Sequence, residues 1–265
     1  MTVSPSKRKP EKTQKKNRHQ LTRNQHVLPE KIIERFADTD GHVAVFFKEG
    51  RRRGEFVRLP YKEKGLFCAK RVWNQGSEDT TKTTYEDPFQ ELAKRIIVGT
   101  TQVLDSKDNI TATCFWGLWT SRFQARKNPP QDKPVFGVSG IEDQDLRERI
   151  ERAGGMFINP DRTIPGRVIA GWNIQKITDQ TLMQNPNLAW WIVEAQELEF
   201  IVPDNPGGIP YLPVSPKIAL LALLTQTRGK AYFSKKAVTL LNQDLFHAAD
   251  TYVFANSMPG TTLWT

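Results

Sequence analysis

Strand-type and helix-type apolar patterns alternate along residues 25–265, and this alternation limits the folds available to the chain. Residues 42–47 and 190–195 are short runs rich in β-branched and aromatic side chains, which is typical of strands. Residues 89–97 instead carry apolar side chains at the spacing of one buried helical face. We therefore predict a single globular domain of the α/β or α+β class, with mixed short strands and amphipathic helices, over residues 25–265.

The first half of this domain begins with recognisable boundary signals. Pro29 suits the first turn of a helix that ends near residues 38–41, and a strand at 42–47 follows. Residues 51–54 have the composition of a hairpin connection into a second strand at 55–59. Asp87 and Pro88 begin the helix over 89–97, whereas residues 110–119 are compatible with either a strand or a buried helix.

The second half gives four further expectations. Ser139 and Glu142 have the spacing of a capping box before a charged helix over about residues 143–153. Residues 190–195 and 198–202 are predicted to be two strands joined by a turn. Ser215 and Pro216 are predicted to begin an apolar helix that runs to about residue 224, and another long helix begins near Ser234.

Basic residues are concentrated at the N-terminus. The whole chain has a formal charge of +9, and residues 1–24 account for +7 of it, because Glu11 is their only acidic residue. With Val3 and Leu21 as their only large apolar side chains, these residues are predicted to form a disordered basic arm. Its basic side chains are Lys7, Arg8, Lys9, Lys12, Lys15, Lys16, Arg18 and Arg23.

Clustered cations on a flexible segment attract the phosphate backbone of DNA or RNA, so nucleic acid is the partner that the arm predicts. A tail that only raises solubility or carries an address remains an equal alternative. An anionic membrane surface is less favoured, because the arm has no apolar anchor.

Cysteine content and hydropathy point to the cytoplasm. The two cysteines, Cys68 and Cys114, are too few for a disulfide framework and lack the spacing of a metal site. The N-terminus stays polar until about Val27, which does not fit a secretory signal. The longest apolar run, residues 218–224, is much shorter than the roughly 20 residues of a membrane span, so we predict no membrane insertion.

Several short motifs resemble an uncharacterised, mainly bacterial family of domains of unknown function. Residues 25–29 (QHVLP) match its N-terminal His-x-x-Pro motif, and residues 41–45 (GHVAV) match the strand that follows. Residues 86–89 (EDPF) and 212–216 (LPVSP) are also similar to it, as is the final helix and strand up to residue 255. The resemblance spans nearly the whole globular part, and it implies polar positions of interest without implying a reaction.

The Asp-Asn-Pro motif of this family is present at Asp204-Asn205, but Pro203 stands where the family usually has Ser. An activity that needs this serine hydroxyl is therefore expected to be altered or absent here.

Four polar residues at element boundaries form the candidate catalytic set: His26, Glu86, Asp204 and Asn205. If they meet in a cleft, they could bind a divalent metal or position a water molecule for hydrolysis. The alternative for each is structural, since Asp-Asn-Pro-Gly-Gly is good turn chemistry and His26 and Glu86 are suitably placed to stabilise helix starts. Cys68 and Cys114 are interpreted as buried apolar residues.

The sequence thus leaves two functional hypotheses. The first is a hydrolase that acts on nucleic acid recruited by the basic arm, and it requires the four candidate residues to converge. The second is a non-catalytic module that binds nucleic acid or protein, and it predicts that the four residues are scattered. The chain has no phosphate-binding glycine loop, zinc-finger spacing, metalloprotease helix or serine elbow, which removes the commonest enzyme classes.

Overall fold

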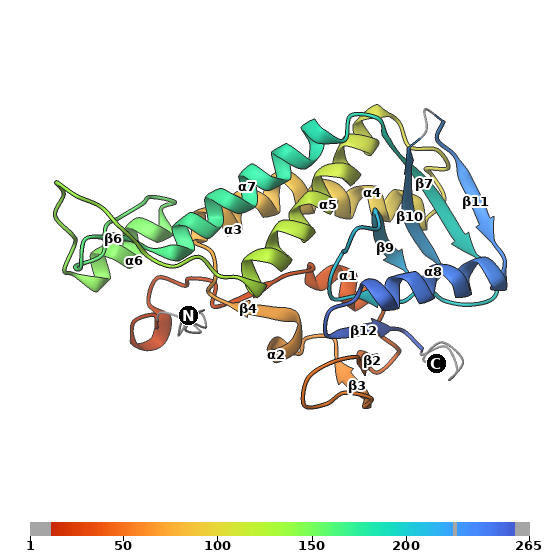
Figure 1. Cartoon of the computed structure of the whole chain (residues 1–265), viewed down its shortest axis with the longest axis horizontal. Coiled ribbons are helices and arrows are strands. Elements are labelled where there is room, and N and C mark those ends of the chain that lie inside the picture. The colour runs from red at the N-terminus through yellow and green to blue at the C-terminus, as the bar shows by residue number, and fades with distance from the viewer. Residues whose placement is uncertain (1–11, 225–226, 258–265) are drawn as a thin grey trace, which may run out of the picture.

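A computed structural model describes residues 12–224 and 227–257 of the chain. It shows a mixed α+β domain in which two four-stranded sheets are packed with helices, and this confirms the predicted fold class. Long helices cross the upper part of the molecule in Figure 1, and the two sheets lie toward its right and lower sides.

The first sheet contains the predicted N-terminal hairpin and the end of the chain. Its order is β3 (Phe56–Pro60), β2 (His42–Phe47), β12 (Tyr252–Ala255) and β8 (Val202–Pro203), and all its neighbouring strands are antiparallel. Alternate residues of β2 are buried, as expected for a strand with one face toward the core. The predicted strands at 42–47 and 55–59 are therefore confirmed.

The second sheet is more deeply buried. Its order is β11 (Lys230–Phe233), β7 (Leu188–Ala195), β10 (Ile218–Leu224) and β9 (Tyr211–Ser215), with β11 parallel to β7 and the other pairs antiparallel. Trp190 and Ile192 of β7 face the larger hydrophobic core, whereas Val193 and Ala195 face a second core.

Two predictions in this region are wrong. The apolar run from Ile218 is a strand and not a helix, because it forms a hairpin with β9 and lies between β9 and β7, where an all-apolar strand is favoured. Residues 198–202 do not form a second strand next to β7. Only Val202 and Pro203 are in a strand, and they pair with β12 in the other sheet.

A long helical region begins with α3 (Gln75–Thr81), continues through a π-helical turn, η2 (Lys82–Glu86), and ends with α4 (Asp87–Ile97). Next to it lie α5 (Ser106–Lys127) and α7 (Gly166–Gln184), which pack along each other. The ambiguous residues 110–119 belong to α5. Buried side chains surround this helix on most sides, which is why its pattern shows no clear helical period.

Shorter elements complete the fold. They are η1 (Lys15–Asn17), β1 (Asn24–His26), α1 (Glu30–Arg35), α2 (Lys64–Phe67), β4 (Cys68–Lys70), β5 (Lys133–Pro134), α6 (Gln144–Arg152), β6 (Thr163–Ile164) and α8 (Lys235–Ala248). Helix α8 begins next to Ser234, as predicted, and the Ser234 side chain caps it by accepting from Ala237 N. The capping box proposed for α6 is wrong, because Asp143 and not Ser139 caps that helix.

The N-terminal residues differ most from expectation. Residues 1–11 lie outside the described residues, but residues 12–24 pack against α6 and β4 and are not a disordered arm. Leu21, the one large apolar side chain of residues 12–24, is 2% exposed and anchors the segment together with these polar contacts. The globular part thus begins before residue 25. Within the described ranges, no helix is long and apolar enough to cross a membrane.

Candidate functional site

A buried arginine on α5 organises the largest group of charged side chains that contains predicted site residues. Arg122 is 1% exposed, although it carries a charge. Its Nη2 lies 2.7 Å from Glu86 Oε1 and 3.5 Å from Glu78 Oε2, and it donates a 2.9 Å hydrogen bond to Thr81 Oγ1. Its guanidinium carbon lies 5.3 Å from the centre of the Trp73 ring. We call Arg122, Glu78, Glu86 and His26 the Arg122 cluster.

The π-helical turn explains why Glu78 and Glu86 reach the same arginine. In a regular α-helix, two residues eight positions apart are rotated by about 80° from each other. One π turn adds a residue without adding rotation, so the pair behaves like residues about seven apart, which lie on one face. Trp73 Nε1 also donates to the Glu78 carboxylate. Burial raises the pKa of Glu78, although Arg122 and Trp73 oppose this shift.

His26 joins the cluster from β1. Its backbone oxygen accepts a hydrogen bond from Arg122 Nη1 at 3.3 Å, and its ring Nε2 lies 3.5 Å from Glu30 Oε2. Burial lowers the pKa of His26 despite the nearby Glu30 and Glu86 carboxylates, so the ring is neutral at pH 7. Within the described part of the chain, the buried Nε2 atom has no hydrogen-bond partner. A neutral ring nitrogen of this kind can accept a proton.

The other two candidates have structural partners in a different place. Asp204 accepts hydrogen bonds from the backbone N–H groups of Asp250 (2.8 Å) and Thr251 (2.9 Å), in the connection between α8 and β12. Asn205 donates to Ala248 O at 3.3 Å and accepts from Gly207 N at 2.9 Å. Only the bond between Asn205 and Gly207 is the local contact that the turn interpretation anticipates, and the others tie this turn to the connection between α8 and β12.

The structure therefore brings His26 and Glu86 to one arginine, whereas the hydrogen bonds described for Asp204 and Asn205 are with residues 207 and 248–251. A cavity of about 10 Å³ adjoins Asp204, with Val27 and Trp119 among its other lining residues. This volume holds about one water molecule and no substrate. Among residues 12–224 and 227–257, no three His, Cys, Asp or Glu side chains are arranged to hold a metal ion. Burial raises the pKa of Cys68 to about 11, so its thiol is not a nucleophile at neutral pH.

The segment of residues 12–24 is held by uncharged groups and one histidine. Gln14 N donates to Glu148 Oε1 at 2.7 Å, and His19 Nε2 lies 2.8 Å from Asp145 Oδ1. Asn17 and Leu21 share two hydrogen bonds, one in each direction, through the Asn17 side-chain amide and the Leu21 backbone. These contacts fix the path of the segment across the surface.

The basic side chains of the same segment point outward. All five that the structure describes are exposed, and no acidic residue occurs between positions 12 and 24. Arg18 lies 3.6 Å from Asp145 but is 75% exposed. We call these five residues the basic strip: Lys12, Lys15, Lys16, Arg18 and Arg23. The remaining basic residues of the predicted arm, Lys7, Arg8 and Lys9, lie outside the described residues.

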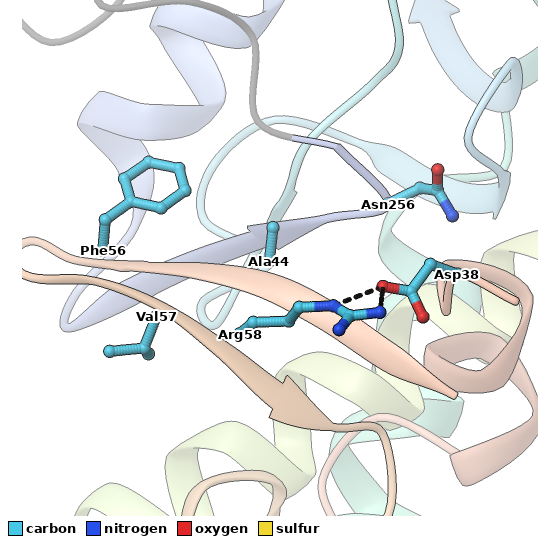
Figure 2. A pocket seen from close by; sticks show the side chains of 6 residues that line it. All are labelled: Asp38, Ala44, Phe56, Val57, Arg58 and Asn256. Carbon is cyan, nitrogen blue, oxygen red and sulfur yellow. Dashed lines mark hydrogen bonds and ion pairs between the residues drawn. The ribbon is translucent and has the colours of Figure 1, made fainter. Parts of the chain in front are cut away.

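A larger hollow lies on the first sheet. It has a volume of about 250 Å³ and is lined by Asp38, Ala44, Phe56, Val57, Arg58 and Asn256. Figure 2 shows the small Ala44 side chain at its floor, with the Phe56 ring on one side and Asn256 and Asp38 on the other. The sequence analysis proposed none of these six residues as a site residue.

Sequence reasoning also missed Glu78, Trp73 and Arg122. Glu78 and Glu86 are not at an α-helical spacing, so only a known π turn would have paired them. Arg122 lies in the segment whose secondary structure was left open, but an arginine among aromatic residues was a usable signal, because such a buried charge requires acidic partners.

No family model, no curated protein and no solved structure matches this chain. The resemblance to a family of unknown function therefore stays a sequence-based prediction.

Proposed function

We propose that this protein binds nucleic acid through the basic strip. The observation that carries the proposal is the separation of roles within residues 12–24. Gln14, His19 and Leu21 hold the segment against the domain, while all five Lys and Arg side chains are exposed. An ordered row of cations without an intervening acid matches the charge pattern of a phosphate backbone.

The fixed path of the strip adds to its affinity. A disordered arm loses conformational entropy when it binds, whereas a segment that is already anchored loses less. Binding releases counterions from the phosphates, so the affinity is expected to fall steeply as salt rises. Phosphate contacts carry no sequence information, and the expected binding is tolerant of sequence.

The test compares two variants with the same change in net charge. One variant replaces the five residues of the basic strip with Gln. The control replaces five exposed lysines elsewhere with Gln, namely Lys94, Lys107, Lys176, Lys235 and Lys236. Affinities for fluorescent DNA and RNA are measured over a range of salt concentrations.

We expect the strip variant to bind at least about tenfold more weakly and with a flatter salt dependence, since each lost phosphate contact removes about 0.9 from the slope for duplex DNA. The control should keep the slope of the unmodified protein. Equal losses in the two variants would contradict the proposal. Substitution is preferable to deletion of residues 1–24, because deletion would also remove the buried Leu21.

The Arg122 cluster supports a second candidate function, hydrolysis of the bound nucleic acid. Glu78, whose pKa is raised by burial, can hold a proton, and the neutral His26 ring can accept one. This pair keeps only His26 of the predicted set and adds Glu78, because Glu86 is paired with Arg122 and both Asp204 and Asn205 lie in a turn. The test is cleavage of labelled DNA and RNA, with and without Mg²⁺, by the intact chain and by Glu78→Gln. If the intact chain does not cleave, or if Glu78→Gln cleaves as well as the intact chain, this candidate is contradicted.

A further inference from the structure

Arg35, the last residue of α1, is held between two other elements of the fold. Its Nε atom donates to Val214 O of β9 at 2.6 Å, and its Nη1 atom donates to Gln90 Oε1 of α4, also at 2.6 Å. Gln90 is buried, with 7% of its surface exposed. These two bonds fix the guanidinium at the junction of α1, α4 and β9.

Two donor atoms at this junction have no acceptor. Arg35 Nη2 and Gln90 Nε2 are both buried, and within the described part of the chain neither has a hydrogen-bond partner. The orientation of the Gln90 amide follows from its contact with Arg35, because a guanidinium only donates and the amide oxygen must face it. The amide nitrogen is thereby left as a second donor. Buried polar groups are nearly always bonded to protein, water or an ion.

The positive charge of Arg35 also lacks a direct counterion. Burial lowers the pKa of Arg35 to about 10, so the side chain is still charged at pH 7. The Glu34 carboxylate opposes this shift, but Glu34 is exposed and accepts a hydrogen bond from Tyr61 Oη at 3.2 Å. Among the described residues, no carboxylate forms an ion pair with Arg35, whereas the buried Arg122 has Glu86.

We propose that Arg35 and Gln90 bind a small monovalent anion of the chloride type at the junction of α1, α4 and β9. Such an anion accepts from both donors and balances the charge of the guanidinium. A water molecule fits less well, because its own hydrogens need acceptors, and the two oxygens at the junction, Val214 O and Gln90 Oε1, already accept from Arg35. A larger anion such as phosphate is disfavoured, because both donor atoms are buried and neither residue lines the hollow or the small cavity.

The anion would link three elements that meet only in the folded chain, so unfolding releases it. Chloride should therefore stabilise the folded state. Once the chloride concentration exceeds the dissociation constant, the equilibrium constant of unfolding is expected to fall about tenfold for each tenfold rise in chloride, as for any ligand bound once and only by the folded state. This effect is independent of the basic strip and of nucleic acid.

The experiment measures unfolding of the full chain by urea at several chloride concentrations, with sodium gluconate keeping the ionic strength constant. Urea adds no chloride, and gluconate is too large for a buried site. Two variants alter the site: Gln90→Glu supplies a carboxylate next to Arg35, and Arg35→Met removes the cation. Gln124→Glu is the control, because it makes the same change of charge at an exposed position of α5.

We expect the unmodified chain and Gln124→Glu to be stabilised by chloride, and both site variants to lose this dependence. In gluconate alone, Gln90→Glu should unfold at a higher urea concentration than the unmodified chain, because its carboxylate takes the place of the anion. Crystals grown in bromide should show an anomalous peak next to Arg35 Nη2 and Gln90 Nε2.

Three results would overturn the proposal. If chloride does not stabilise the unmodified chain, water satisfies the two donors. If Gln90→Glu and Arg35→Met keep the full chloride dependence, the anion binds elsewhere. A bromide peak at the junction without any effect of chloride on unfolding would mark an adventitious ion only.

Discussion

Glu86 Oε1 lies 2.7 Å from Arg122 Nη2, and this ion pair joins the helical region of α3, η2 and α4 to α5 in the interior of the domain. The Arg122 end of the pair is fully buried, with 1% of its side chain exposed, and the Glu86 side chain is 15% exposed. A charge in such a place is tolerated only if its partners are held in position. The π turn holds Glu86, and with it Glu78, in register with the arginine.

We predict that Arg122→Leu destabilises the protein by about 3–5 kcal/mol, because it leaves two carboxylates in the interior without their cation. The measurement is the free energy of unfolding by denaturant. Arg149→Leu on the exposed face of α6 is the control and should change the stability by no more than about 0.5 kcal/mol. Similar small effects from both substitutions would show that the cluster does not hold the helices together.

The local elements were predictable wherever one physical signal dominated. The hairpin of β2 and β3, helix α4 and the start of α8 follow from apolar spacing and capping residues close in the sequence. The run that begins at Ile218 was predicted to be a helix from the start signal at Ser215 and Pro216, but this signal was misleading, because an all-apolar segment suits a buried strand and a buried helix equally. The hairpin with β9 decided the outcome, and pairing between segments is not visible in the periodicity of one segment.

The candidate site was predictable only in part for a related reason. His26 and Glu86 were recognised as polar residues at element boundaries, but their common partner Arg122 lies in a distant helix. The basic arm was predicted from its charge, and its anchoring was not. One buried leucine and a few hydrogen bonds to α6 outweigh the conformational entropy that this polar segment loses when it is ordered.

The titration of His26 should favour the folded state at higher pH. Burial lowers its pKa below the ordinary value of 6.5, so the unfolded chain binds the proton more readily than the folded chain. The stability that comes from the neutral ring is therefore present above about pH 6.5 and is lost as the pH falls through the lower folded pKa. We expect the unfolding free energy of the unmodified protein, relative to His26→Gln, to decrease over this interval. A difference that does not vary with pH would contradict the burial of the ring.

Glu78 should show the opposite dependence. Burial raises its pKa above the ordinary 4.5, so the folded state holds its proton to a higher pH than the unfolded state does. The stability associated with the protonated carboxyl is present below about pH 4.5 and is lost as the pH rises through the folded pKa. The free energy of unfolding of the unmodified protein, relative to that of Glu78→Gln, should therefore decrease as the pH rises through this range. An increase would mean that Arg122 outweighs burial at this carboxyl.

Leu21→Ala should release the basic strip without unfolding the domain. The leucine is 2% exposed, and its loss removes the main apolar contact of residues 12–24. We expect faster amide hydrogen exchange at residues 17–21, where the Asn17 pair would open, and little change in the central strand β7. The exposed Leu240→Ala serves as the control. Equal exchange in the two variants would show that polar contacts alone hold the segment.

Substitutions of Asp204 distinguish a structural role of this residue from a catalytic one. Its two carboxylate oxygens accept from the backbone N–H groups of Asp250 and Thr251, so Asp204→Ala leaves both donors without this partner in the turn before β12. We expect a loss of about 1–3 kcal/mol in unfolding free energy and a smaller loss for Asp204→Asn, which keeps one acceptor. Nucleic-acid affinity, measured per folded molecule, should be unchanged in both variants. Unaltered stability combined with a loss of cleavage would instead return Asp204 to the catalytic set, because a turn residue affects activity only by way of folding.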